Sequence, residues 1–222
     1  FYSQTARVLI FYMEDYIRKM YIKHVKGKSF EHTKKCQNPA FDERSLHEAS
    51  QKVTDQAFSI GDFNARECIG SLNWVVCQVR ADCAFQCNVL ASYTHKTTHE
   101  LAKAFGRVMK FLLDTADKGI IHEPKCLEFM KTAYRADTRV VAFGDAAFST
   151  TGNKAISGLA IYYLGTLVAW KSKKQSLISQ STGQAEVQAT ADIIRLQDRL
   201  LAVKPRQKYP KLRSLKMPSG TV

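Results

Sequence analysis

Two carboxylates stand out because each lies in an otherwise apolar or helically patterned stretch of the chain. Asp145 interrupts the apolar run RVVAFGDAAFS (residues 139–149), and Glu186 lies near the start of STGQAEVQATADIIRLQDRLLA (residues 181–202). Carboxylate oxygens suit Mg²⁺, and clustered carboxylates can hold two divalent metals that activate water and stabilise a leaving oxygen. The pattern makes Asp145 and Glu186 candidate metal ligands and catalytic residues. The alternative is an ordinary α/β fragment with a salt-bridged Asp and a first-turn Glu that suits the helix dipole.

Strand-like patterns surround Asp145. Because side chains alternate along a strand, Asp145 shares one face with the apolar residues two positions away on either side. Residues 154–164, rich in Ile and Tyr, predict a second strand, residues 165–166 a turn, and residues 167–170 a further strand. The sequence therefore predicts a strand followed by a hairpin. The predicted partners of Asp145 on its face are Val141, Phe143 and Ala147.

A helix is predicted after the hairpin, over residues 181–202, and another upstream, over residues 97–114. In the later helix an apolar stripe at i, i+3 and i+4 spacing reaches Glu186 when extended one turn back. We therefore expect Asp145 and Glu186 to lie on buried or half-buried faces, facing each other across a strand–helix contact. In the upstream helix, Thr97 and Glu100 predict a capping box. The stripes are Ala189, Ile193, Leu196, Leu200 and Val203 in the later helix, and Leu101, Ala104, Phe105, Val108, Phe111 and Leu112 upstream.

Several blocks of the chain resemble copia-type retrotransposon polymerases, in the same order and near the same spacing. KAISGLAIYYLGTLVAWKSKKQS (residues 154–176) resembles the family's STSGYVFFLGGxxISWKSKKQ. On either side, FGDAAF (residues 143–148) resembles YSDADWAG, and STGQAEV (residues 181–187) resembles SSTEAEY. Upstream, IGSLNW and RADCAF resemble the connection segment IGSLxYL…TRPDIAF, and residues 98–115 resemble PTxxHxxAxKRVLRYLKGT.

On this resemblance the chain is identified as a truncated, diverged piece of a copia-type LTR retrotransposon Pol polyprotein, from its reverse transcriptase and ribonuclease H region. The resemblance implies an α/β fold: a ribonuclease H-like front half, with a three-stranded antiparallel sheet plus helix, preceded by a mainly helical connection segment. The implied reaction is two-metal hydrolysis, with Mg²⁺ or Mn²⁺, of RNA in RNA–DNA hybrids. The expected divisions are a diverged or spliced N-terminal segment (1–55), the connection (56–135), the partial ribonuclease H-like domain (136–203) and a basic, disordered tail (204–222).

The chain departs from the family at its carboxylates. The second Asp of the family's first motif is Ala147 here, and the first Glu of TEAE is Gln184, whereas Glu186 keeps the catalytic Glu that the resemblance implies. The family's next catalytic Asp, in a CDN-like motif, has no counterpart; Asp137 and Asp192 are the nearest candidates. Because two acids alone hold two metals poorly, we expect hydrolysis to be weak or lost. The alternatives are a non-catalytic basic nucleic-acid-binding remnant, a domesticated interaction protein, or a decayed element without a stable fold.

The N-terminal residues offer a second, polymerase-like resemblance. RVLIFYMED (residues 7–15) resembles VLLxYVDD of the reverse-transcriptase palm hairpin, which makes Glu14 and Asp15 a candidate remnant of the polymerase metal site. Residues 23–55 are polar and charged, and we interpret them as loop or spliced sequence. The alternative to the palm hairpin is an amphipathic helix whose apolar face carries Leu9, Tyr12, Met13, Tyr16 and Met20.

The charge of the chain favours a polyanionic partner. Lys and Arg outnumber Asp and Glu by 33 to 20 in 222 residues, which gives a net charge of +13, and basic surfaces bind nucleic acid through counterion release. Basic residues gather in three clusters, at residues 18–35, 171–174 and 204–216. In the middle cluster Trp170 adjoins Lys171, Lys173 and Lys174, a combination that can pair phosphate contacts with stacking. The alternative is a solvated basic loop.

Other features limit the class of protein. No apolar stretch is long enough to span a bilayer, and we expect no membrane partner. Cysteines that serve as core residues favour a reduced setting, so we expect an intracellular protein, cytoplasmic or nuclear, that binds RNA–DNA hybrid or other nucleic acid. An exposed sheet edge would permit self-association. Cys83 and Cys87, followed by His95 and His99, superficially match zinc-ligand spacing. We instead interpret these two cysteines as buried apolar residues, one helical turn apart.

Overall fold

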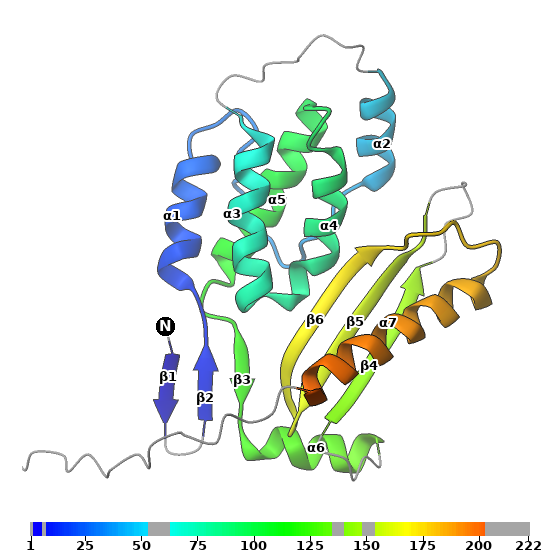
Figure 1. Ribbon diagram of the computed structural model, residues 1–222. Helices are drawn as coiled ribbons and strands as arrows, with labels where there is room; N and C mark the ends of the chain where they lie inside the picture. The colour runs from blue at the N-terminus through cyan, green and yellow to red at the C-terminus, as the bar shows by residue number, and fades with distance from the viewer. Residues whose placement is uncertain (1, 6–7, 53–62, 135–139, 148–153, 203–222) are drawn as a thin grey trace, which may run out of the picture.

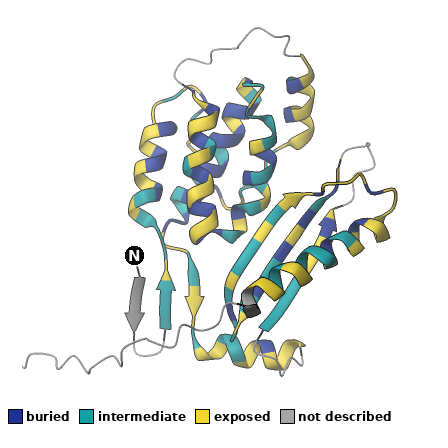
Figure 2. Cartoon of the chain, viewed as in Figure 1, coloured by how far each residue is buried: buried dark blue, intermediate teal, exposed yellow. Residues whose placement is uncertain are grey.

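The helices between residues 14 and 114 form a helical body (Figure 1). The computed structural model describes residues 2–5, 8–52, 63–134, 140–147 and 154–202. A single core of buried apolar residues, contributed by every helix of this body, holds the body together (Figure 2). Its elements are α1 (Glu14–His24), α2 (Glu43–Lys52), α3 (Ala65–Gln78), the 3₁₀ turn η1 (Ala81–Cys83), α4 (Ala84–Tyr93) and α5 (His99–Asp114).

Helix α5 is central to this core, and its predicted apolar stripe is confirmed. All six residues of the stripe are buried, and Phe105 and Leu112 are fully inaccessible to solvent. The helix begins one residue later than the predicted capping box requires: Thr98, not Thr97, is the N-cap, and its Oγ1 accepts a hydrogen bond from the backbone N–H of Leu101 at 3.1 Å. A side-chain oxygen at this position satisfies one of the donors that open a helix.

The N-terminal residues belong to the same core. Ile17, Met20 and Tyr21 of α1 and Leu46 of α2 are buried in it. The interpretation of residues 23–55 as loop is therefore wrong for Glu43–Lys52, which forms a helix. That helix is polar because only its two buried residues, Leu46 and Ser50, face the body.

A three-stranded sheet with order β1-β2-β3 lies below the helical body in Figure 1. All its strands are antiparallel: β1 (Tyr2–Thr5) pairs with β2 (Val8–Phe11), which pairs with β3 (Ile120–His122). The chain after β3 continues into α6 (Pro124–Tyr134). The start of β3 lies close to the end of β2, since a Cβ added to Gly119 would stand 1.8 Å from the Phe11 carbonyl oxygen.

The predicted strand, hairpin and helix are confirmed in the C-terminal part. Strands β4 (Val140–Ala147), β5 (Ile156–Tyr163) and β6 (Thr166–Lys174) form an antiparallel sheet in the order β4-β5-β6, and α7 (Thr182–Ala202) packs on β4 and β5. The sheet and α7 approach closely because their contact residues are small: Ala146, Ala185 and Ala189 form one buried cluster. Gly144 has no room for a side chain, since a Cβ there would stand 1.9 Å from Ile193.

The hairpin turn differs by one residue from the prediction. Leu164 and Gly165 form it, with φ of 49° and 80°, so that β6 begins at Thr166 and continues to Lys174, beyond the predicted end at Trp170. Positive φ at both central residues is the geometry of a two-residue turn whose twist matches the flanking strands. Among the helices that the structure describes, none is long and apolar enough to cross a membrane.

Candidate functional site

Asp145 lies on the face of the β4-β5-β6 sheet that α7 does not cover. Its neighbours Gly144 and Ala146 contact α7, so alternation along β4 directs the Asp145 side chain to the other face. There it lines a groove between the sheet and the η1–α4 segment of the helical body. The carboxylate is exposed, and its Oδ1 accepts a hydrogen bond from the Ala146 N–H at 2.8 Å.

Glu186 lies elsewhere. It is an exposed residue of α7, next to Ala185, which is buried against the sheet. The predicted arrangement of Asp145 and Glu186 is therefore wrong: neither side chain is buried, and they do not face each other across the strand–helix contact. The reason is that α7 packs through Ala146 and Gly144, the residues on either side of Asp145, rather than through the face that carries the acid.

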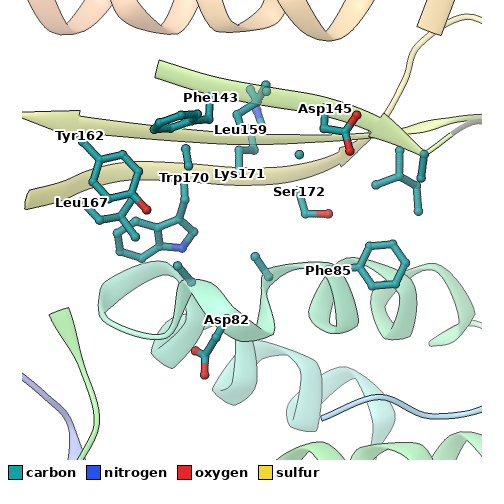
Figure 3. A pocket seen from close by; sticks show the side chains of 17 residues that line it. Asp82, Phe85, Phe143, Asp145, Leu159, Tyr162, Leu167, Trp170, Lys171 and Ser172 are labelled. Carbon is teal, nitrogen blue, oxygen red and sulfur yellow. The ribbon is translucent and has the colours of Figure 1, made fainter. Parts of the chain in front are cut away.

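The groove that contains Asp145 is a cavity of about 730 Å³ (Figure 3). We call it the Asp145 groove. Its floor is the uncovered sheet face, where Asp145, Gly158 and Ser172 form one cross-strand row and Phe143, Ala160 and Trp170 the next. Its opposite wall contains Asp82 of η1 and Phe85 of α4. The site therefore combines aromatic side chains on the floor and on the opposite wall with a carboxylate and a hydroxyl on the floor.

Trp170 joins the sheet to the helical body. Its indole Nε1–H donates a hydrogen bond to the backbone carbonyl oxygen of Val76 in α3, at 3.0 Å. The ring is half-buried. It lines both the Asp145 groove and a second cavity of about 410 Å³ on its other side, which Asn73 and Asn88 also line. We call this second cavity the Asn88 pocket.

The predicted basic cluster lies on β6, but alternation divides it. Lys174 pairs with Ile156 and shares the groove face with Trp170 and Ser172, whereas Lys171 and Lys173 belong to the opposite face. All three lysines are exposed. None of them takes part in an ion pair with a carboxylate among the residues that the structure describes.

The other predicted acids do not join Asp145. Glu14 and Asp15 open helix α1, where Glu14 pairs with Arg18 at 2.6 Å and Asp15 is exposed. Neither alternative for this segment holds in full, since β2 ends at Phe11 and a helix, not a hairpin, begins at Glu14. Asp192 lies on α7, 3.7 Å from Arg195. Asp137 lies outside the described residues.

The described residues do not provide the ligand set for Mg²⁺ or Mn²⁺ that the resemblance implies. Across the described part of the chain, no three His, Cys, Asp or Glu side chains converge. Asp82, the acid on the groove wall that faces the sheet, is already bound by both Nε and Nη2 of Arg80, at 3.0 and 2.8 Å. Within the described part of the chain, Asp145 thus lacks the neighbouring carboxylates with which a two-metal site is built.

The cysteines behave as core residues, as predicted. Cys83 and Cys87 are buried. Burial raises the pKa of the Cys87 thiol to about 12 and that of Cys83 further, which disfavours the thiolate that binds zinc. The zinc alternative with His95 and His99 finds no support, because these four residues form no ligand group in the described structure.

Sequence reasoning missed two parts of the site. The first is Arg80, which is 1% exposed although its side chain is charged. The RADCAF block could have indicated this role, because Asp82 follows Arg80 at a spacing that permits a bidentate contact. The second is the wall that Phe85 and Asn88 contribute to the two cavities. No local pattern marks these residues, because they meet the sheet only through tertiary packing.

Comparison with known proteins connects these features to retrotransposons. The chain is 28% identical over 127 residues to the Retrovirus-related Pol polyprotein from transposon RE2 of Arabidopsis thaliana, and 25% identical over 127 residues to that from transposon RE1 of the same plant. Both matches cover 57% of this chain and 8% of the relative. No protein-family model and no solved structure matches the chain.

A yeast relative extends the similarity beyond plants. The chain is 28% identical over 134 residues to the Transposon Ty1-LR3 Gag-Pol polyprotein of Saccharomyces cerevisiae, a match that covers 60% of this chain and 7% of the relative. The chain thus spans less than a tenth of the length of these curated relatives. Taken with the ordered sequence blocks, the matches support a diverged fragment that is similar to retrotransposon Pol polyproteins.

Proposed function

We propose that this Pol fragment binds nucleic acid along the lysine-bearing strand β6 without hydrolysing the RNA of RNA–DNA hybrids. One observation carries the proposal. The lysines of β6, Lys171, Lys173 and Lys174, are exposed and form no ion pair in the described structure. The two candidate metal ligands, Asp145 and Glu186, do not share a face and so cannot bind the same metal ions. Ammonium groups on an exposed strand suit phosphate contacts that depend on charge and not on sequence. The similarity to Pol polyproteins supports the choice of nucleic acid as the partner.

The first test is salt-dependent binding. Changing Lys171, Lys173 and Lys174 together to Gln should weaken binding of a labelled RNA–DNA hybrid at least about tenfold at low salt. The same change should lower the slope of log K against log salt by about one unit per lysine. Fluorescence anisotropy at several salt concentrations measures both quantities.

The matched control removes the same charge elsewhere. Lys118, Lys125 and Lys131, exposed residues in and near α6, are changed to Gln. If binding depends on the local strand, the control keeps most of the wild-type affinity and slope. Equal losses in the two triple variants would show that only net charge matters and would refute β6 as the binding strand.

The second test is cleavage. Wild-type protein and Asp145→Ala are incubated with an RNA–DNA hybrid, labelled on the RNA strand, in Mg²⁺ or Mn²⁺. We expect no RNA product above the level of the variant, because the carboxylates in the described structure do not converge. Metal-dependent cleavage that Asp145→Ala abolishes would contradict the proposal and show that residues outside the described structure complete a metal site.

A further inference from the structure

The Asp145 groove and the Asn88 pocket together form a space suited to a flat organic group. Their volumes, about 730 and 410 Å³, fall in the range of small-molecule sites. They meet at Trp170 and Ser172, which line both. Gly158 and Ala160 keep the centre of the sheet floor free of large side chains.

Two buried polar atoms lack partners, one at this junction and one in the adjoining Asn88 pocket. Ser172 Oγ and Asn88 Nδ2 are inaccessible to solvent and form no hydrogen bond among the described residues. Buried polar groups in proteins are nearly always hydrogen-bonded, and leaving one unpaired is costly. A hydroxyl at the junction and an amide in the adjoining pocket therefore suit a ligand that carries both donors and acceptors.

Aromatic side chains supply the faces of the site. Phe143 and Trp170 lie on the sheet floor, and Phe85, 37% exposed, stands on the opposite wall (Figure 3). Aromatic faces bind nucleobases by stacking, whatever the base. The space between floor and wall is thus lined to hold one planar ring system against a phenyl or indole face.

The distribution of charge decides which part of a nucleic acid enters. The acidic side chains that line the groove are Asp145 and the Arg80-bound Asp82. Lys171 also lines it, but alternation along β6 directs its ammonium group to the opposite face of the sheet. The cations are the exposed lysines of edge strand β6, with Lys174 on the groove face and Lys171 and Lys173 on the opposite face. Phosphate is therefore repelled from the interior and attracted to the rim, which orients the base inward and the backbone outward.

We infer that the Asp145 groove binds one unstacked nucleobase of a single-stranded nucleic acid whose phosphates follow β6. The Asp145 Oδ2 atom, which is not engaged by the Ala146 N–H, accepts a hydrogen bond from an exocyclic amino group, so adenine and cytosine bind better than thymine. Ser172, which lines the groove, hydrogen-bonds the remaining base edge. The phosphate part of this inference rests on the proposed function; the base part does not.

The first experiment uses ligands without phosphate. The chain has two tryptophans, so Trp74→Phe leaves Trp170 as the sole indole reporter. Titration with adenosine, cytidine and thymidine should change Trp170 emission saturably. The affinity should be little affected by salt and weakest for thymidine. Asp145→Asn should remove the difference between cytidine and thymidine. An emission that no nucleoside alters would overturn the inference.

The second experiment separates base from phosphate in a strand. Binding of single-stranded oligo(dC) is compared with that of an abasic oligomer of equal length and charge. Phe85→Ala should weaken binding of oligo(dC) about 5- to 150-fold, the range for losing one base–aromatic stack, and leave the abasic oligomer unaffected. The control is Phe129→Ala, which removes an exposed phenyl group from α6. Equal affinity of wild-type protein for the two oligomers would refute the base site.

The two proposals fail in different ways. Suppose that the Lys171/Lys173/Lys174→Gln variant binds both oligomers as wild type does, while Phe85→Ala weakens binding of oligo(dC) but not of the abasic oligomer. The β6 proposal then fails and the base site stands. If the lysine variant loses both oligomers equally and Phe85→Ala has no effect, the β6 proposal stands and the base site fails.

Discussion

Replacing Arg80 with alanine should lower the free energy of unfolding by about 3 kcal/mol or more, the scale for emptying a large buried side-chain site and leaving its partners unpaired. The guanidinium is 1% exposed and serves several groups at once. Nη1 and Nη2 donate to the backbone oxygen and Oγ1 of Thr115, at 3.0 and 2.7 Å. Nε and Nη2 hold Asp82, and the cation stands 5.2 Å from the centre of the Phe111 ring.

Urea denaturation gives the size of this effect, and two variants define its cause. Arg66→Ala removes an exposed arginine of α3 and should change stability by less than about 0.5 kcal/mol. Arg80→Lys should fall between the two, because an ammonium cannot donate in the planar fork that reaches both Asp82 and Thr115. Midpoints of Arg80→Ala and Arg66→Ala that coincide would contradict the assigned role.

Gly165→Ala should also destabilise the protein strongly, by about 2–4 kcal/mol, from two separate causes. The residue has a φ of 80°, which costs an L-residue about 1–2 kcal/mol. In addition, a Cβ there would stand 2.4 Å from the backbone of Cys126 and Leu127 in α6, so the hairpin or the helix must shift. Overpacking of this kind typically costs about 1–3 kcal/mol.

Gly27 offers a control that isolates the second cause. Its φ is 75°, close to that of Gly165, but no atom lies within 4 Å of the position of an added Cβ. Gly27→Ala should therefore carry the backbone cost alone. Thermal or urea unfolding of the two variants would measure the difference. If the two substitutions destabilise equally, the close approach of the hairpin turn to α6 does not exist in solution.

The local elements were predictable because each leaves a periodic trace in the sequence. The alternation around Asp145 and the spacing from Leu101 to Leu112 predicted β4 and α5, and the structure confirms both. The predicted boundaries of the elements were less accurate. The N-cap at Thr98 differs by one residue from the prediction because two neighbouring Thr residues fit the capping pattern equally well. The turn at Leu164 and Gly165 also differs by one residue, because adjacent residues fit the turn pattern equally well.

The arrangement of the candidate site was not predictable in the same way. Alternation shows that Asp145 and Phe143 share a face, but not which face a helix covers. That choice depends on Gly144 and Ala146, whose small size lets α7 approach. Helix α2 was missed because it is mostly polar, and Arg80 because burial of a charged group depends on Thr115, 35 residues away.

Four of the six free thiols can be oxidised only when the helical body opens. Cys36, Cys68, Cys83 and Cys87 all lie in one closely packed core, out of reach of oxidants while the core is closed. Opening of that core exposes four sulfur atoms together, and a sulfur that becomes a sulfinic acid no longer fits an apolar interior. These four thiols should therefore be oxidised at the rate at which the core opens, so any ligand or substitution that slows opening also slows their oxidation.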